Sequence, residues 1–163
     1  MRKPVLVAAL LAALTGAAPT SAAPESTAPA SMAGDHAMEA LETALAMGFL
    51  AALGRLDFDA AGAMLDEEAV LELPFAGDGL TVRGRDTIVQ FFRRTMAGSV
   101  GAIEYRLVRA YPSPAAGALV LEIATQGRTA AGRDYENRLV GVFEFRGGKI
   151  VLFREYFNPA PLG

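Results

Sequence analysis

The sequence contains no cysteine and a single histidine, His36. Without cysteine the chain cannot form a disulfide, a thiolate metal site or a lipoprotein anchor. No cluster of His, Asp or Glu has metal-ligand spacing, and the HExxH motif is absent. A glycine-rich phosphate loop and a serine nucleophile elbow are also missing. The sequence therefore predicts no metal and no cofactor.

An excess of positive charge is missing as well. The chain has 15 basic and 18 acidic residues, and its arginines are scattered rather than clustered. Without the first 23 residues the balance is 13 basic against 18 acidic, a net charge of −5. That sign argues against a nucleic acid or an anionic membrane as partner.

The N-terminus has the order of an export signal. Arg2 and Lys3 precede an apolar run over residues 5–14, which is too short to span a bilayer. The small residues Ser21-Ala22-Ala23 fit a cleavage site, which places cleavage after Ala22 or Ala23. We expect residues 1–23 to be removed, and the mature protein to be periplasmic or secreted with no membrane anchor.

Residues 24–34 lack periodicity and are expected to form a flexible leader. The remaining residues, 35–163, are enough for one domain with its own core. Asp35 is the expected N-cap of a first helix that ends at Gly54-Arg55. The core-facing stripe of this helix comprises Leu41, Leu45, Gly48, Phe49 and Ala52.

Two more helices are expected, and strands make up most of the remainder. Asp57 can cap a short helix through Leu65, and a third helix starts near Arg85-Asp86. The inner face of the third helix comprises Ile88, Phe91, Phe92, Thr95 and Met96. Strands are expected at 70–75, 80–82, 102–111 and 118–126, with a loop at 127–132 before two final strands.

The two final strands form a hairpin around Arg146-Gly147-Gly148, and its loop length decides which side chains share a face. A two-residue turn pairs Phe145 with Ile150, whereas a three-residue loop pairs Phe145 with Lys149. The longer loop sorts the sequence better and is the one we predict. One face then carries Asn137, Leu139, Gly141, Phe143, Val151, Phe153, Glu155 and Phe157. The other carries Arg138, Val140, Val142, Glu144, Ile150, Leu152, Arg154 and Tyr156.

Helices followed by a run of antiparallel strands indicate an α+β fold, in which the helices cover one face of a curved sheet. The segments YENR, FEFRGGKI and REYFNP resemble the C-terminal hairpin of the SnoaL-like branch of the NTF2-like superfamily. Within it, the phenazine-biosynthesis A/B type proteins are the most similar. Leu73-Pro74-Phe75 and residues 82–88 resemble the family's strand-to-helix segment, so the resemblance covers residues 36–159. It implies an NTF2-like cone, in which a curved antiparallel sheet wraps around three N-terminal helices.

The mouth of such a cone is a concave apolar cavity, the usual form of a small-molecule site. The candidate lining residues are Phe49, Phe75, Phe92, Tyr105, Asn137, Phe153 and Glu155. Phe49, Phe92 and Phe153 also have the spacing of plain core residues, which is the simpler interpretation of them. For Tyr105 a core role and a ligand contact are equally good interpretations, because a buried phenol needs a polar partner at one end. Asn137 either orients a polar group in the cavity or makes a hydrogen bond at the end of the hairpin.

Glu155 is the candidate catalytic residue. Its neighbours on the same face, Phe153 and Phe157, should desolvate the carboxylate and raise its pKa above the free value of about 4.3. Such a group can act as a general acid or base near neutral pH. The phenazine-type resemblance implies the same role for this glutamate of the REY motif. The alternative is a structural role, in which Glu155 pairs with Arg109 or with an Asn at the rim of the cavity.

Two functions remain open. One is a cofactor-independent enzyme of the isomerase, cyclase or lyase type, in which Glu155 transfers a proton on a small hydrophobic molecule. The other is a non-catalytic ligand-binding or dimeric interaction module. The phenazine-type site also uses a histidine, and His36 lies beside the leader, which favours the second function. The buried glutamate favours the first.

The outer face of the sheet is expected to form a homodimer. It carries an apolar patch of Val120, Ala124, Val140, Val142, Ile150, Leu152 and Tyr156. Charges of alternating sign surround this patch, namely Glu104, Arg106, Glu122, Arg138, Glu144 and Arg154. A solvated face would be polar nearly throughout, and a two-fold axis could pair these charges between two copies. The resemblance also implies dimerisation through this sheet.

Overall fold

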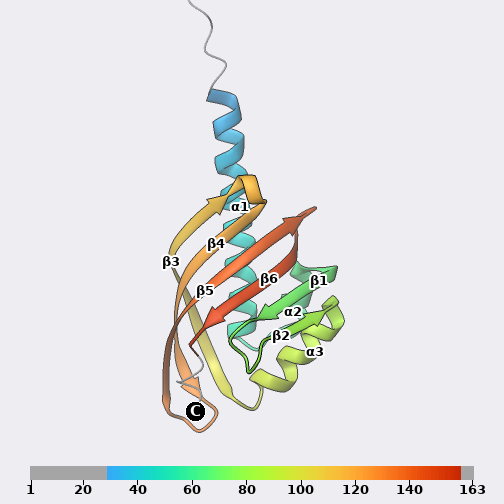
Figure 1. Ribbon diagram of the computed structural model, residues 1–163. Coiled ribbons are helices and arrows are strands. Elements are labelled where there is room, and N and C mark those ends of the chain that lie inside the picture. Colours follow the sequence, from blue (N-terminus) through green and yellow to red (C-terminus); the bar gives the residue numbers. More distant parts are fainter. Residues whose placement is uncertain (1–28, 159–163) are drawn as a thin grey trace, which may run out of the picture.

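The computed structural model describes residues 29–158 (Figure 1). The predicted signal peptide and the first residues of the predicted leader lie outside the described residues. The helices are α1 (Pro29–Gly54), α2 (Phe58–Met64) and α3 (Arg85–Met96), with a short 3-10 turn, η1 (Pro114–Ala116). The strands are β1 (Leu65–Leu73), β2 (Leu80–Arg83), β3 (Val100–Ser113), β4 (Ala118–Thr129), β5 (Asp134–Arg146) and β6 (Lys149–Phe157).

The strands form one six-stranded sheet in the order β2-β1-β6-β5-β4-β3. All neighbours are antiparallel except β1 and β6, which run parallel. The curved sheet lies in front of α1 in Figure 1, and the helices cover its concave face. The predicted α+β cone is therefore confirmed.

The core lies between α1 and the concave face of the sheet. Phe49 of α1 is fully buried and contacts Phe92, Phe143 and Phe153 edge-on, with ring centroids 5.4–6.4 Å apart. Phe143 and Phe153 face each other across β5 and β6 and stack at 4.7 Å. Aromatic pairs of this kind add about 0.5–1.5 kcal/mol each to the stabilisation from their buried area.

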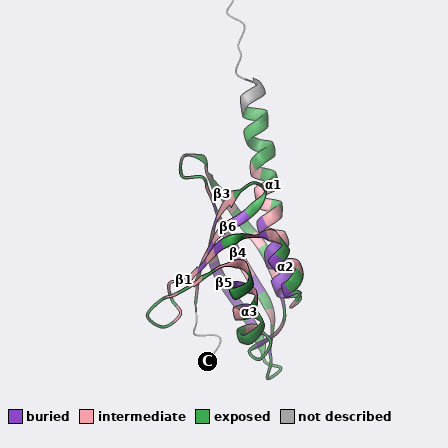
Figure 2. Ribbon diagram, turned by 90° about the vertical axis from the view of Figure 1, so that its right-hand side faces the viewer, coloured by how far each residue is buried: buried purple, intermediate pink, exposed green. Residues whose placement is uncertain are grey.

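Helix α1 begins earlier than its expected N-cap. It starts at Pro29, so Asp35 and residues 29–34 of the predicted leader are helical. Proline is favoured at the first helical position, and the alanines that follow are strong helix formers. The N-terminal half projects beyond the sheet (Figure 2), which leaves Leu41 of the expected core stripe 66% exposed. By length and composition Met32–Gly54 would suffice to cross a membrane, but its C-terminal half belongs to the core.

Short-range sequence signals correctly predicted most of the other helices and strands. Asp57 caps α2 by accepting a hydrogen bond from the Ala60 amide at 3.1 Å, as predicted. Helix α3 and the β1–β2 hairpin are also confirmed. Strand β4 continues through Gly127, in the segment expected to be a loop, because this glycine lets β3 approach closely. A Cβ at that position would lie 2.5 Å from the Ala102 carbonyl oxygen.

The terminal hairpin has one of the two alternative registers at its tip and neither of them along its body. Its tip is the two-residue turn, which pairs Phe145 with Ile150, so the predicted pairing with Lys149 is wrong. The register then shifts, so that Phe143 faces Phe153 and the predicted division of faces holds along the body of the hairpin. Ile150 lies on the tip side of the shift and is fully buried, so it is not part of the outer patch. A β-bulge of one residue accounts for both results.

Candidate functional site

A cavity of about 250 Å³ opens between α1, α3 and the sheet. Strands β3, β5 and β6 supply its tyrosines and its glutamate, while α1 and α3 supply mainly apolar side chains. The walls comprise Leu50, Leu53, Leu73, Ala76, Phe91, Phe92, Thr95, Met96, Ser99, Val100, Ile103, Tyr105, Tyr135, Phe153, Glu155 and Phe157. Its volume lies just below the roughly 300–1,000 Å³ of typical ligand pockets, which suits a small molecule.

Glu155 lies in the wall of this cavity, on β6 between Phe153 and Phe157, which also line it. The opposite residue on β5 is Gly141. A Cβ on this glycine would lie 2.8 Å from the Phe143 ring and 3.4 Å from the Phe153 ring. The absence of a side chain at Gly141 therefore leaves room for the rings of Phe143 and Phe153.

Glu155 is half-buried, and its carboxyl group has no hydrogen bond or ion pair with any described residue. The alternative ion pair with Arg109 does not form, and that guanidinium lies 5.9 Å from the ring centre of Tyr111 on β3. Burial without a compensating charge raises the pKa of Glu155 from its ordinary value of 4.5 to about 7. The predicted direction is confirmed, and the group can hold or release a proton near neutral pH.

Tyr105 of β3 lines the same cavity. Its pKa is raised above the ordinary value of 10.0, chiefly by burial and then by the nearby charges that Glu155 and Tyr135 would carry. Tyr105 therefore remains a neutral phenol at physiological pH. It adds a hydroxyl group to a largely apolar wall.

Asn137 does not line the cavity. Its Nδ2 donates to the Tyr135 hydroxyl at 3.1 Å and to the Asn158 carbonyl oxygen at 2.8 Å. Its Oδ1 accepts from the Arg138 amide at 2.8 Å. Of the two interpretations of Asn137, the structure supports the hydrogen bond at the end of the hairpin. The residue that reaches the cavity is Tyr135, which the sequence analysis missed although it precedes Asn137 by two and shares its face.

The phenylalanine candidates divide into two groups. Phe92 and Phe153 line the cavity, whereas Phe49 is enclosed by aromatic rings in the core. Phe75 was wrongly placed, because it follows the end of β1 and is 57% exposed. Its ring packs against Tyr156, with centroids 5.6 Å apart.

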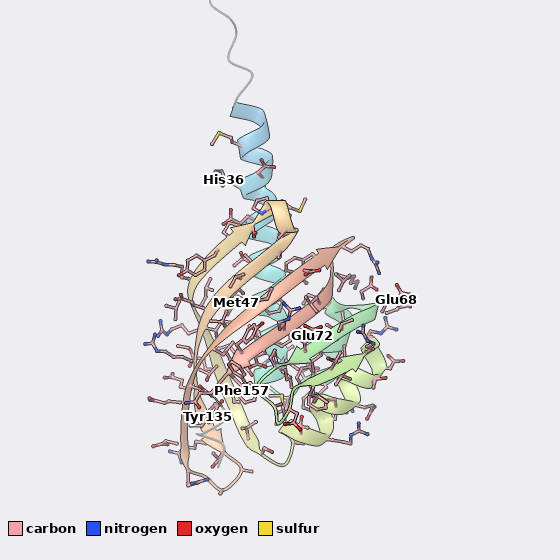
Figure 3. The ribbon with its side chains drawn as sticks, viewed as in Figure 1. His36, Met47, Glu68, Glu72, Tyr135 and Phe157 are labelled. Carbon is pink, nitrogen blue, oxygen red and sulfur yellow. The ribbon has the colours of Figure 1, made fainter. Side chains whose placement is uncertain are left out.

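A second, more open groove of about 800 Å³ lies beyond the cavity and shares Ile103, Tyr105 and Tyr135 with it. The groove has charged residues of both signs, including an Arg128–Asp134 ion pair at 3.7 Å. Figure 3 places Tyr135 and Phe157, both in the cavity wall, at the lower end of the sheet. Among residues 29–158, no three His, Cys, Asp or Glu side chains are grouped so that they could hold a metal ion.

Comparison with known proteins agrees with this architecture. The protein YesE of Bacillus subtilis (strain 168) is 26% identical over 114 residues, covering 68% of this chain and 77% of YesE. The structure of a LEH-like epoxide hydrolase from M. tuberculosis is 28% identical with a TM-score of 0.61, covering 77% of this chain and 86% of the hydrolase. A protein of ketosteroid isomerase-like fold from Catenulispora acidiphila, solved with trimethylamine, has a TM-score of 0.62 at 17% identity over 72% of this chain and 88% of its own.

The family model of the SnoaL-like domain matches residues 46–153. The matched segment runs from the buried half of α1 to Phe153 on β6 and includes most of the cavity wall. This chain belongs to the SnoaL-like domain family.

Proposed function

We propose that this protein binds a small, largely apolar molecule in the cavity and that Glu155 exchanges a proton with it. The observation that carries the proposal is a half-buried carboxyl group in a largely apolar wall, without a partner among the described residues and with a pKa of about 7. A general base or acid works best when its pKa lies near the operating pH. Glu155 would take a proton from the ligand as carboxylate and return it at another atom as carboxylic acid, which is isomerase-type chemistry.

The likeness to a LEH-like epoxide hydrolase supports an enzymatic role for the chain. This hydrolase is 28% identical to the chain. A carboxyl group with a pKa near 7 could protonate the oxygen of an opening epoxide ring or remove a proton from the attacking water. The same fold hosts many functions, so the reaction must follow from the site itself. Membership of the phenazine-type branch stays a prediction.

The second candidate is a non-catalytic ligand-binding protein. It is favoured by the position of His36, which lies on the exposed, projecting part of α1 (Figure 3), away from the cavity-lining residues. No described histidine lines the cavity, so Glu155 would act without the histidine of the phenazine-type site. In this case the cavity would hold its ligand unchanged.

Proton exchange on a simple ketone separates the two candidates. We would incubate the mature protein with 1-indanone in D₂O, and follow the loss of the α-proton NMR signal together with binding. Catalysed exchange that falls about 10²- to 10⁴-fold in Glu155→Gln, with binding retained, supports the enzyme. Binding without exchange supports the ligand-binding protein. Glu136→Gln, which removes an exposed glutamate of β5, is the matched control.

We also propose that the protein is exported and that it forms a homodimer through the outer face of the sheet. Export follows from the order of residues 1–23. Ile150 is not part of the outer patch. Its remaining large members are half-buried, namely Val120, Val140, Val142, Leu152 and Tyr156. Some charges around the patch have partners within the chain, since Arg154 bonds Glu72 and the Tyr111 hydroxyl bonds Glu122. The apolar centre rather than the charged rim would then hold two copies together.

A further inference from the structure

We infer that Tyr135 recognises the ligand by donating a hydrogen bond to an acceptor oxygen in the cavity, and that Asn137 sets the direction of that donor. The inference rests on the proposed binding of a small molecule in the cavity. It narrows the ligand class to an apolar molecule that carries a carbonyl, ether or epoxide oxygen. Tyr135 is the specificity-determining residue, and Asn137 is a positioning residue outside the cavity.

The amide of Asn137 has one orientation that satisfies all three of its neighbours. Its oxygen faces the Arg138 amide, a donor, at 2.8 Å, and its nitrogen faces the Asn158 carbonyl oxygen, an acceptor, at 2.8 Å. The nitrogen also lies 3.1 Å from the Tyr135 hydroxyl oxygen. Because an amide nitrogen only donates, the Tyr135 oxygen must accept this bond.

The hydroxyl proton of Tyr135 must therefore point away from Asn137. Within residues 29–158, no acceptor lies within hydrogen-bonding distance of it, although the side chain is only 7% exposed. The residue lines the cavity, so the unused donor can be satisfied there. A buried donor without a partner costs about 1–3 kcal/mol, and an acceptor on a ligand would relieve that cost.

The other hydroxyl groups in the wall differ in this respect. Thr95 of α3 donates to the Phe91 carbonyl oxygen at 2.9 Å, so its proton is already used. Tyr105 has no neighbour that orients its hydroxyl. Tyr135 alone, among the described tyrosines in this wall, has an oxygen that is held by a donor. Its preorganised proton should contribute more to ligand discrimination than a freely rotating one.

The test compares 1-indanone with indane, which has the same ring system without the carbonyl oxygen. Dissociation constants for both would be measured by NMR on the wild type, Tyr135→Phe, Asn137→Asp and Thr95→Val. The wild type should prefer 1-indanone two- to tenfold, as expected for one neutral hydrogen bond. Tyr135→Phe should bring the ratio of the two constants close to one, whereas Thr95→Val should keep the wild-type ratio.

Asn137→Asp tests the positioning role. Its carboxylate would accept the Tyr135 proton and so redirect the donor away from the cavity, which should also remove the preference for 1-indanone. A general structural defect would weaken binding of both probes and leave the ratio unchanged. If Asn137→Asp does not fold, Tyr135→Phe decides the matter.

Two other outcomes are informative in different ways. If the wild type binds both probes equally, or Tyr135→Phe keeps the preference, the role of Tyr135 is refuted and the cavity remains a binding site. If the wild type binds neither probe, the proposed function fails for this ligand class, and the role of Tyr135 falls with it.

Discussion

Replacing Glu155 by glutamine should change the stability of the protein in a way that depends on pH. In the wild type the folded state holds the carboxyl proton up to a pKa of about 7, whereas the ordinary value is 4.5. The stability that this protonated group contributes is fully present below pH 4.5. It is lost as the pH rises to 7, because the folded state must then ionise a carboxyl group in an apolar wall.

The size of the effect follows from the two pKa values. Each tenfold difference between folded and unfolded proton affinity corresponds to about 1.4 kcal/mol, so the full shift amounts to about 3 kcal/mol. Glutamine is neutral at every pH and has nearly the same shape. Glu155→Gln should therefore match the wild type near pH 4 and exceed its free energy of unfolding by up to about 3 kcal/mol at pH 8.

Urea denaturation of both proteins between pH 4 and pH 8.5 would measure this difference. Other titrating groups affect both proteins equally and cancel. Glu136→Gln removes the same charge from an exposed position of β5 and so reports the effect of net charge alone. A difference between Glu155→Gln and wild type that stays constant with pH would show that the carboxylate is not desolvated. The general acid–base role would then lose its basis.

Other predictions concern packing, assembly and export. Gly54→Ala should destabilise the fold by about 3 kcal/mol in urea denaturation, because a Cβ would lie 2.1 Å from a β3 carbonyl oxygen. Gly34→Ala has open space in the same helix and should stabilise it by up to about 1 kcal/mol. Val142→Arg should dissociate the proposed dimer in sedimentation at micromolar concentration, and a dimer that persists contradicts the outer-face interface. Sequencing of exported material should begin at Ala23 or Pro24, and full-length chain retained in the cytoplasm contradicts export.

Much of the fold could be predicted because its signals are local. The alternation of residues along β4 separates buried Leu119, Leu121 and Ile123 from half-buried neighbours, as expected for a sheet with one core face. Asp57 sets the start of α2 through a bond to a residue three positions away. The spacing of Ile88 and Phe92 likewise identified the inner face of α3. These features depend on the spacing of apolar residues and on helix-capping residues, and both can be seen directly in the sequence.

The errors arose where distant segments determine the outcome. Leu41 continues the apolar stripe of α1, but the sheet ends before it, so the residue is exposed. Ile150 is buried because a bulge changes the register next to the hairpin tip, and either turn was compatible with the sequence. Phe75, which follows β1, packs on Tyr156 because β6 is the parallel neighbour of β1, and the sequence alone did not show this pairing. In each case tertiary context overrode a correct local pattern.

The candidate site shows the same division at the level of single residues. Strand parity places Tyr135 and Asn137 on one face, but it does not show which of them reaches the cavity. That choice depends on Asn158, whose carbonyl oxygen binds the Asn137 amide and leaves the cavity to the phenol of Tyr135. The apolar surroundings of Glu155 could be predicted because its aromatic neighbours are two residues away on the same strand.

The positions of the polar groups also indicate how such a site can vary. Glu155, Tyr135 and Tyr105 all lie on strands of the sheet, where ladder hydrogen bonds fix the backbone. Much of the remaining wall comes from α3 and from the segment that follows it, including Met96 and Ser99. Sites on sheet strands are held more rigidly than sites on loops. The sheet therefore sets which chemical groups face the ligand, while α3 and the turn after it set the size and access of the cavity.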